Sequence, residues 1–594
     1  MKLNLSLIST FFALFYSLTS VGQSPNIVFI FADDQGWNGT SHQMDSSRSN
    51  SQSDYYQTPN LNVLGQEGMT FSQAYAPAPK CSPSRNSILT GQTTARRQFT
   101  NTTSVVNSSN FLLEPSSLTN ILASETTFAE VIQQENSNYW LAHYGKWHLG
   151  AGGPEMHGFD RSDGNTSNLS AQGTATQTDP KLMFEITDSA LTFIKDAQNA
   201  GRPFYVQLSH YAVHSPSELR PTTLNTLSSG VRPIGTVHRD TLFGGMTEDL
   251  DAAVGLLLDS LTAWGLDSTT YVVYMSDNGS SRGVSSNRPL SRGKTFLAEG
   301  GIRVPLIIKG PNIPMNTYTT RPVIAYDLYP TFVDWMLGST ASVPSIVEGT
   351  SLKNLANASS PIINRANGLL FHSPHYDISA AKGPESAIRN DSFKLLVDYE
   401  SGEFHLYNMT NDIEENVDLK ATYPLVLAAL CLELRDYLKS VNAAMPSLNP
   451  NYLGNGGPVG DYDNDGLEDA WEFRELLTHI YTATDDPDGD GFDNASEFLN
   501  ETDPYVFDVN NGLSSLLNEL EIELYPNPVR TQLNINSKED FDQILIYDYT
   551  GEKLLKKSRR TSLNVARFPS GIYFLSLEKE GEIIYTQEIT IVKD

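Results

Sequence analysis

Short apolar runs alternate with longer amphipathic segments along residues 23–340, and this alternation predicts the fold class. Five runs are rich in β-branched and aromatic residues, as the buried strands of a parallel sheet are: NIVFIF, YWLAHYG, FYVQLS, YVVYMS and VPLIIKG. Residues 182–197 and 245–261 instead place apolar side chains at helical spacing. We therefore predict an α/β domain with a mainly parallel sheet flanked by helices.

The pattern changes three times after residue 340. Residues 341–447 mix strand-like runs with an apolar helix around Cys431, which predicts a smaller α+β subdomain. Residues 448–505 begin with a linker rich in Pro, Gly and Asn and then become strongly acidic. Residues 506–594 open with a second linker and then alternate like β-structure, with turns at YPNP and PSG, which predicts a β-sandwich-like unit.

The amino-terminal end predicts export. Residues 1–22 combine Lys2, an apolar stretch and small residues near the end, the pattern of a signal peptide. No later run reaches the roughly 20 apolar residues that a transmembrane helix needs. We therefore expect a protein without a transmembrane segment that passes through the periplasm and is secreted or held at the cell surface.

Charge and cysteine content narrow the partners. The chain has 40 basic and 69 acidic residues and a net charge of −29, which disfavours nucleic acid as a partner. Its only two cysteines, Cys81 and Cys431, allow one disulfide without requiring it. Burial of Cys431 as a small apolar residue is the alternative.

Polar side chains directly follow four of the predicted strands, where an open α/β sheet binds its ligands. They are Asp33 and Asp34, Lys146 and His148, His210 and His214, and Asp277 and Asn278. The carboxylate and amide oxygens in this set suit Ca²⁺ or Mg²⁺ better than zinc. Two histidines four residues apart can bind zinc on a helix, but this pair leaves a strand, so zinc is the less favoured alternative.

The segment PAPKCSPSRNSILTGQ, residues 77–92, predicts a helix with Cys81 at its start. Pro83 suits the first helical position, and Gly91 suits the residue that ends a helix. Arg85 lies four residues after Cys81 and so shares its face of the helix. A helix N-terminus and a guanidinium lower the pKa of a thiol, which favours a thiolate nucleophile. A hard-cation site is a poor companion for such a thiolate, so this interpretation is incomplete.

CSPSR followed by LTGQ resembles the signature of the formylglycine-dependent type I sulfatases of the alkaline phosphatase-like superfamily. NIVFIFADDQGW, GKWHLG, SDNG and GKTFLAEGGIRVP resemble further blocks of that family in the same order. FKLLVDYESGEFHLYNMTNDIEEN resembles its C-terminal subdomain, so the resemblance spans residues 25–446. It implies an alkaline phosphatase-like fold and a catalytic Ca²⁺. It also implies that a formylglycine-generating or anaerobic sulfatase-maturating enzyme oxidises Cys81 to formylglycine (3-oxoalanine).

The resemblance also implies a role for each site residue. The calcium ligands are Asp33, Asp34, Asp277, Asn278 and the modified Cys81, and the catalytic contacts come from Arg85, Lys146, His148, His214 and Lys294. Arg85 holds the aldehyde hydrate, one hydroxyl of which attacks sulfur, while Lys146, His214 and Lys294 contact the sulfate. His148 takes the proton of the other hydroxyl as sulfate leaves, and His214 or Lys294 protonates the leaving oxygen.

Two further histidines, His372 and His375, lie in FHSPHY. Related sulfatases carry a similar histidine-containing loop near the pocket mouth, which implies substrate contact. Packing of the loop is the alternative, and the sequence leaves both open.

Residues 461–472 and 486–497 both match D-x-D-x-D-G-x₅-E, the twelve-residue calcium loop. No convincing helix precedes the first loop, so the pair looks more like the calcium repeats of dockerins or of thrombospondin type 3 than like EF-hands. We expect structural calcium in both loops, and a solvated acidic linker is the alternative. The expected ligands are Asp461, Asp463, Asp465 and Glu472, followed by Asp486, Asp488, Asp490 and Glu497.

Residues 521–594 resemble the C-terminal sorting domain of type IX secretion, through LYPNPVRTQLNI, ILIYDYTGEKLL and FPSGIYFLSL. The resemblance implies the type IX secretion machinery as a partner. It also implies that the chain crosses the outer membrane and is released or attached at the cell surface.

Together these features predict a secreted sulfatase, a sulfuric ester hydrolase. Outward export suits a polymeric substrate, so we expect a sulfated carbohydrate such as ulvan, carrageenan or fucoidan, or its oligosaccharides. One alternative is a phosphate or phosphonate ester hydrolase of the same superfamily, against which CSPSR and the single hard-cation set argue. Another is a catalytically dead, calcium-dependent polysaccharide-binding surface protein.

Overall fold

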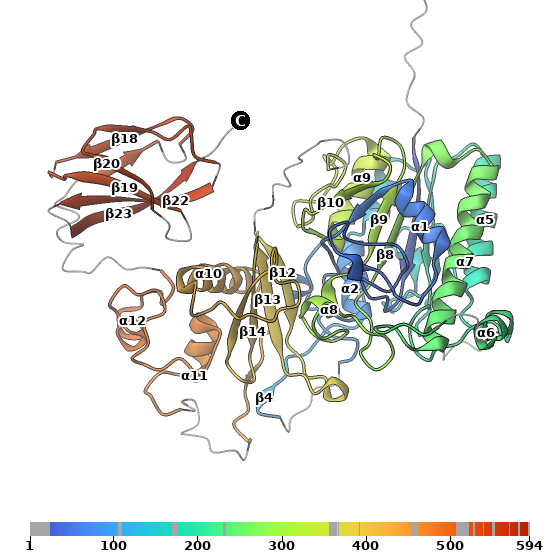
Figure 1. Ribbon diagram of the computed structural model, residues 1–594, viewed down its shortest axis with the longest axis horizontal. Coiled ribbons are helices and arrows are strands. Elements are labelled where there is room, and N and C mark those ends of the chain that lie inside the picture. Colours follow the sequence, from blue (N-terminus) through green and yellow to red (C-terminus); the bar gives the residue numbers. More distant parts are fainter. Residues whose placement is uncertain are drawn as a thin grey trace, which may run out of the picture.

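The computed structural model describes residues 24–104, 110–168, 176–229, 233–355, 365, 367–390, 392–452, 461, 463–506, 522–526, 529–538, 540–548, 553–569, 571–579 and 582–591. The predicted signal peptide, residues 1–22, lies outside these residues. Figure 1 shows an α/β domain, a smaller α+β unit beside it and a β-unit near the C-terminus. Within the described ranges, no helix combines the length and the apolar character that a membrane-spanning helix requires.

An eight-stranded sheet forms the centre of the α/β domain. Its strands are β1 Asn26–Ala32, β2 Met69–Phe71, β5 Trp140–Gly145, β6 Arg161–Ser162, β7 Phe204–Ser209, β8 Thr270–Ser276, β9 Leu306–Lys309 and β10 Thr317–Thr319. Their spatial order is β10-β2-β9-β8-β1-β7-β5-β6. The strands from β8 through β1, β7 and β5 to β6 run parallel, as the alternating pattern predicts.

Strand β9 departs from the predicted parallel arrangement, because it pairs antiparallel with β8 and with β2. Between β8 and β9 the chain forms only one short helix, α8 Glu299–Ile302, and no long crossover helix that would carry it back to the opposite edge of the sheet. It therefore re-enters the sheet from the edge at which it left. The apolar run VPLIIKG is equally well buried in either direction, so its composition does not fix the direction.

Helices cover both faces of the sheet (Figure 1). Those of the α/β domain, besides α8, are α1 Pro59–Gln66, α2 Cys81–Thr90, α3 Thr94–Arg97, α4 Phe128–Glu135, α5 Met183–Asn199, α6 Pro221–Ser228, α7 Thr241–Ala263 and α9 Leu328–Leu337. Val28 and Ile30 of β1 share one core with α1, α5 and α7, whereas Phe29 and Phe31 share the other with α2, α4 and α9. This division follows because successive strand side chains point to opposite faces.

The second unit is an antiparallel sheet covered by one long helix. Its strands in spatial order are β12 Leu369–Ser373, β13 Glu385–Asn390, β14 Phe393–Asp398 and β15 Phe404–Asn408. Helix α10, Pro424–Ser440, shares a core with this sheet. The predicted boundary at residues 340 and 341 falls between α9 and β12. Cys81 and Cys431 are both buried free thiols, so the possible disulfide is not formed.

Two short strand pairs complete these units. β3 Ala74–Tyr75 pairs parallel with β11 Val323–Ile324, and β4 Leu112–Leu113 pairs antiparallel with β16 Ser447–Leu448. The second pair ties the segment after α10 to the α/β domain.

A buried ion network joins the α/β domain to the second unit. The side chain of Lys394 on β14 is fully buried, and its Nζ lies 3.0 Å from Glu299 Oε1 and 2.8 Å from Glu415 Oε1. Glu299 also accepts a hydrogen bond from the Tyr75 hydroxyl at 2.9 Å. Burial alone would lower the pKa of Lys394, but the carboxylates of Glu415 and Glu299 raise it, so the ammonium stays charged.

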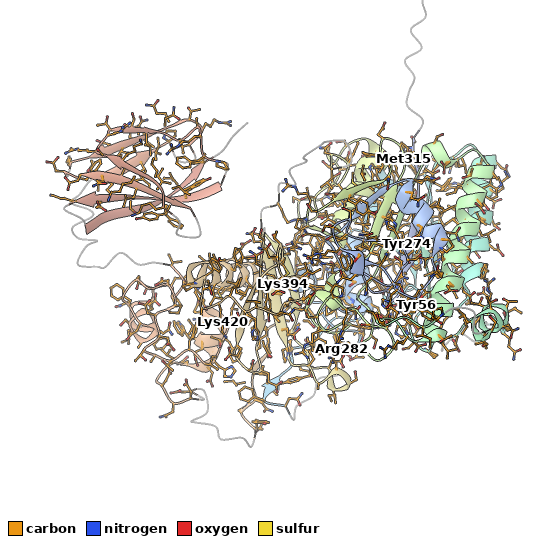
Figure 2. The ribbon with its side chains drawn as sticks, in the orientation of Figure 1. Tyr56, Tyr274, Arg282, Met315, Lys394 and Lys420 are labelled. Carbon is orange, nitrogen blue, oxygen red and sulfur yellow. The ribbon has the colours of Figure 1, made fainter. Side chains whose placement is uncertain are left out.

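Lys394→Met is expected to lower the free energy of unfolding by about 3–5 kcal/mol, because it leaves two buried carboxylates without their shared cation. Differential scanning calorimetry measures the loss. Lys420→Met is the matched control, since Lys420 pairs with Glu403 where both side chains are partly exposed, and such a pair contributes about 0–1 kcal/mol. Figure 2 labels both lysines. Equal losses in the two variants would contradict the proposed strength of the network.

The acidic segment after α10 forms α11 Asp469–Trp471, a π-helical turn Glu472–Leu476 and α12 Asn494–Asn500. Arg435 of α10 pairs with Asp503, which attaches this segment to the second unit. The last unit contains β17 Ile522–Tyr525, β18 Gln532–Ser537, β19 Gln543–Asp548, β20 Lys553–Ser558, β21 Ser562–Asn564, β22 Gly571–Lys579 and β23 Glu582–Ile591. They form two sheets around one shared core, as the predicted β-sandwich-like unit requires.

Candidate active site

Two neighbouring parallel strands bring the acidic residues together. The last residues of β1 and β8 are paired, so the residues that follow them meet at one edge of the sheet. These are Asp33 and Asp34 after β1, and Asp277 and Asn278 after β8, and all four are buried. The backbone N–H of Asp34 donates to Asp277 Oδ1 at 3.0 Å. Asp34 has a φ of 62°, a conformation that costs a non-glycine residue on the order of 1 kcal/mol and that these contacts hold in place.

Helix α2 carries Cys81 and Arg85 to the same edge. It begins at Cys81, with Lys80 as its N-cap, two residues before the start that Pro83 predicts. Proline is tolerated at this third position as well, because the first N–H groups of a helix have no partner within it. Gly91, with a φ of 69°, ends the helix as predicted.

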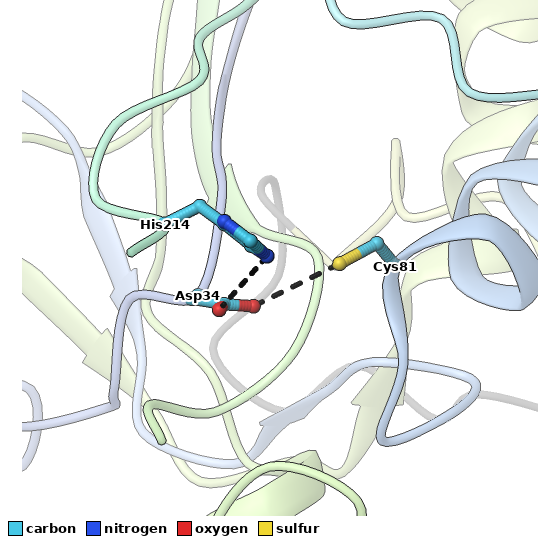
Figure 3. A group of neighbouring side chains, drawn as sticks. All are labelled: Asp34, Cys81 and His214. Atoms are coloured by element: carbon cyan, nitrogen blue, oxygen red, sulfur yellow. Dashed lines mark hydrogen bonds and ion pairs between the residues drawn. The ribbon is translucent and has the colours of Figure 1, made fainter. Parts of the chain in front are cut away.

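Carboxylates surround the Cys81 thiol. Its Sγ lies 3.4 Å from Asp33 Oδ1 and 3.8 Å from Asp34 Oδ1, the second of which is drawn in Figure 3. Burial raises the pKa of the thiol, and the carboxylates of Asp277 and Asp33 raise it further. The predicted lowering of this pKa is therefore wrong, because burial and the acids outweigh the nearby cations. The unmodified Cys81 is not an activated thiolate.

Three buried or nearly buried cations face the acids. The contacts are Arg85 Nη2 to Asp277 Oδ2 at 2.9 Å, Lys146 Nζ to Asp33 Oδ2 at 2.6 Å, Lys294 Nζ to Asp34 Oδ1 at 2.6 Å and Lys294 Nζ to Cys81 Sγ at 3.5 Å. Burial alone would lower the pKa of both lysines, but the facing carboxylates raise it. Both lysines are therefore charged and positioned to attract an anion.

His148 and His214 border this group. His214 has a side chain 24% exposed, and its Nε2 lies 3.8 Å from Asp34 Oδ2 (Figure 3). His148 has a φ of 60°, and its Nδ1 is buried without a hydrogen-bond partner among the described residues. Burial, followed by the charges of Lys146 and Arg85, lowers the pKa of His148 to about 3. Its imidazole is therefore neutral and able to accept a proton.

His210 is not placed as a metal ligand beside His214. It is buried, and burial lowers its pKa to about 3. Among the described residues, the group of potential ligands that contains His214 is completed by Asp34 and Cys81 and does not include His210. This geometry agrees with the low weight that the sequence gives to zinc.

His372 is packed inside the second unit, and His375 is buried where that unit meets the α/β domain. His372 is 2% exposed, and both of its ring nitrogens have partners, Ser386 Oγ at 2.7 Å and the Ala444 carbonyl oxygen at 3.1 Å. His375 is also 2% exposed, and its Nε2 lies 2.8 Å from Thr100 Oγ1. The structure therefore favours packing over substrate contact for both histidines.

The acidic group fits a hard divalent cation. One ligand atom each from Asp33, Asp34, Cys81 and Asp277 lies within 4.8 Å of the others. Asn278 Oδ1 is buried there and accepts no hydrogen bond from the described residues. A buried oxygen without a donor is costly unless a cation or another donor satisfies it. Carboxylate and amide oxygens are the ligands that Ca²⁺ prefers.

The two acidic loops have the backbone shape that their motif predicts. Asp461, Asp463 and Asp465 present ligand atoms within 4.8 Å of one another, and so do Asp486, Asp488 and Asp490. The sixth residue of each loop, Gly466 or Gly491, has a φ of 98° or 93°. Burial raises the pKa of Glu472 to about 8, together with the charges of Asp463 and Asp465, which indicates that Glu472 faces the first loop.

Sequence reasoning missed an ion pair next to the cysteine. Lys80, the residue before Cys81, lies with its Nζ 3.1 Å from Asn101 Oδ1 and 3.3 Å from Asp377 Oδ2. Asp377 directly follows FHSPHY, so this loop reaches the residue before Cys81 through its acid. The sequence feature that could have predicted this contact is the position of Lys80 directly before the motif cysteine.

The central sheet flanked by helices, with the acidic and basic site residues at one of its edges, defines an enzyme with an alkaline phosphatase-like α/β fold. The sulfatase family model matches residues 25–339. Residues 292–441 match the model described as N-sulphoglucosamine sulphohydrolase, C-terminal, and residues 523–592 match the secretion system C-terminal sorting domain. The chain therefore belongs to the sulfatase family, and it is a sulfuric ester hydrolase.

Relatives and a solved structure agree with this placement. A protein named sulfatase from Formosa agariphila is 28% identical over 495 residues, which cover 70% of this chain and 88% of the relative. Bovine arylsulfatase A is 29% identical over 376 residues, 56% of this chain and 67% of the relative. The crystal structure of Ps i-CgsB in complex with k-i-k-neocarrahexaose shares the fold, with a TM-score of 0.57 at 22% identity, over 72% of this chain and 95% of that chain.

Proposed function

We propose that this protein is an extracellular sulfatase that removes sulfate from a carbohydrate polymer or its fragments, with residue 81 as its nucleophile. The observation that carries the proposal is the position of Cys81. It is buried at the start of α2, in contact with two carboxylates and one ammonium. An ordinary thiolate is disfavoured there, whereas an oxidised residue at this position lies beside both a cation site and anion-binding groups.

The proposed nucleophile requires modification of residue 81, and the proposed metal is a bound Ca²⁺ ion. Formylglycine at position 81 supplies a hydrated aldehyde, which can attack sulfur and afterwards release sulfate. Ca²⁺ supplies Lewis-acid charge. The residues that would hold it are Asp33, Asp34, Asp277, Asn278 and residue 81.

The chain's own residues bind the ester and move protons. Arg85, Lys146 and Lys294 present positive charge around residue 81 and stabilise the negative charge that develops on the sulfate oxygens. Neutral His148 accepts a proton from the nucleophilic residue. His214 and Lys294 both contact Asp34, and the His214 side chain is partly exposed. Either residue is therefore placed to protonate the alcohol as it leaves toward solvent.

The proposed destination selects the substrate class. The match of residues 523–592 to a secretion system sorting domain indicates type IX secretion to the surface or the outside. With residues 1–22 as signal peptide, we propose catalytic residues 23–340, a subdomain at 341–447, a calcium-binding spacer at 448–505 and a sorting unit at 506–594. An exported enzyme meets polymers that are too large to enter the cell. We therefore propose sulfated polysaccharides such as ulvan, carrageenan or fucoidan as the substrate class.

Protein coexpressed with a formylglycine-generating enzyme is expected to hydrolyse 4-nitrophenyl sulfate with a kcat/KM at least ~100-fold above that for 4-nitrophenyl phosphate. The reason is that a two-metal phosphatase needs a second set of metal ligands. Among the described residues, the candidate active site contains one hard-cation group and no second set beside it. Product absorbance and ion chromatography measure the two rates. A preference for phosphate would support the phosphatase alternative, and polysaccharide binding without sulfate release by fully modified protein would support the binding protein.

A further inference from the structure

A basic loop stands out on an acidic protein. Residues 279–296 contain Arg282, Arg288, Arg292 and Lys294 and no acidic residue, although the whole chain has a net charge of −29. The loop begins directly after Asn278 and ends just beyond Lys294, whose Nζ contacts Asp34 and Cys81. Its arginines are exposed. The positive charge is therefore concentrated beside the candidate active site.

The loop is held in one shape by its own hydrogen bonds. Asn287 closes it, because its Nδ2 donates to the Ser280 carbonyl at 2.7 Å while its Oδ1 accepts from the Ser280 N–H at 3.1 Å. The Lys294 N–H donates to the same carbonyl at 3.0 Å. A Cβ on Gly36, two residues after Asp34, would come within 2.6 Å of Asn287 Oδ1, so the loop packs directly on the metal-binding segment.

Two arginines share one aromatic ring at the exit of this loop. The guanidinium carbon of Arg282 lies 4.8 Å from the ring centroid of Phe296, and that of Arg292 lies 5.2 Å from it. A Cβ on Gly293 would come within 3.0 Å of Arg282 Cγ, so this side chain lies over the residue before Lys294. Figure 2 labels Arg282 near the lower edge of the α/β domain.

Neither guanidinium has a carboxylate partner among the described residues. Arg161, which also lies over aromatic rings, pairs with Asp196, and Arg303 pairs with Glu299. Glu415, which accepts a hydrogen bond from Ser291 of the loop, pairs with Lys394, and Asp34 pairs with Lys294. The two guanidinium groups are exposed, lie against the same ring and have no carboxylate partner among the described residues. They therefore form a site that can bind an anionic group of a ligand.

We propose that Arg282 and Arg292 form a second anion subsite, which binds another anionic group of the substrate next to the sulfate ester that is cleaved. The ligand chemistry is an oxyanion on a neighbouring sugar position, either a second sulfate ester or a uronate carboxylate. The inference rests on the proposed sulfatase function. It makes this enzyme selective for multiply charged saccharides over isolated sulfate esters.

The test uses aryl sulfates with and without a second anion, each compared between wild-type and variant protein: 4-nitrophenyl sulfate, 1,4-phenylene disulfate, biphenyl-4,4′-disulfate and 4-carboxyphenyl sulfate. In Arg282→Gln/Arg292→Gln protein, kcat/KM for the best doubly charged probe is expected to fall about tenfold through KM, whereas that for 4-nitrophenyl sulfate stays within about twofold. The disulfate and carboxylate arms distinguish the two sources of the second anion. Arg202→Gln is the matched control, because Arg202 also lies over an aromatic ring, Trp140, but at the amino-terminal end of β5.

Binding is measured separately from activity. Calorimetric titration of biphenyl-4,4′-disulfate into Cys81→Ala protein, with and without the two arginine substitutions, is expected to show an affinity loss of about tenfold. Equal selectivity and equal affinity in the double variant and in Arg202→Gln would overturn the subsite. No hydrolysis of any probe by wild-type protein would instead refute the proposed function, and the titration would still decide on the subsite.

Discussion

Cys81→Ala is expected to lower kcat/KM for 4-nitrophenyl sulfate by about 10⁴-fold or more while the protein stays folded, because it removes the only proposed nucleophile. Cys81 is 3% exposed, and the substitution removes a single sulfur atom at the first residue of α2. Loss of so small a group costs on the order of 1 kcal/mol, which is small beside the total stability of a domain. Steady-state assays measure the loss, and circular dichroism with thermal melting measures the fold.

Cys431→Ala is the control for the Cys81 experiment, since Cys431 is an equally buried thiol on α10, in the core of the second unit. Its removal is expected to change activity by less than about twofold. Mass spectrometry of the peptide from Pro79 to Arg85 is expected to show a wild-type fraction lighter than the cysteine form by the thiol-to-aldehyde difference. Undiminished activity of Cys81→Ala, or an active protein whose peptide contains thiol alone, would falsify the mechanism.

The sequence predicts the frame of the site because strand ends are local features. Asp33 and Asp34, and Asp277 and Asn278, each follow a strongly apolar run, and any parallel pairing of those runs brings them to one edge. Gly91 ends α2 for an equally local reason, since its φ of 69° suits glycine. The family resemblance then adds Lys294, whose neighbours give no strand or helix signal of their own.

What the sequence does not determine depends on contacts between distant segments. The pKa of Cys81 is raised because Asp277, 196 positions away along the chain, and Asp33 lie beside it. His372 is packed because Ser386 and the Ala444 carbonyl occupy both ring nitrogens. The direction of β9 depends on where the chain re-enters the sheet. None of these outcomes follows from a local pattern of apolar and polar positions.

The electrostatics of the candidate active site favour two parts of the proposal together, oxidation of Cys81 and metal binding. Burial and Asp33 raise the pKa of Asp277, while Lys146, Arg85, His214 and Lys294 together hold that of Asp33 well below its usual range against the effect of burial. Such closely packed carboxylates tolerate a further cation better than a thiolate, whose charge would add to theirs. A neutral, oxygen-bearing side chain at position 81 removes that conflict.

Removal of calcium is expected to lower kcat/KM by about 100-fold, which corresponds to ~2.7 kcal/mol of transition-state stabilisation, and added Ca²⁺ is expected to restore it. Lys146 pairs with Asp33 and Lys294 with Asp34, each at 2.6 Å, so an ion that fixes these carboxylates also fixes the two lysines that we propose to bind sulfate. Activity measured against free Ca²⁺ in chelator-buffered solution gives the half-activating concentration.

Two substitutions separate the catalytic ion from the ions of the acidic loops. Asn278→Ala removes the buried oxygen that has no donor among the described residues, so it is expected to raise the half-activating Ca²⁺ concentration at least about tenfold. Asp486→Asn changes the second acidic loop, and there we expect an unchanged half-activating concentration but a smaller rise in melting temperature on adding Ca²⁺. Full activity in chelated wild-type protein would show that the reaction does not need calcium, and identical activation curves for the two variants would show that calcium acts away from residue 81.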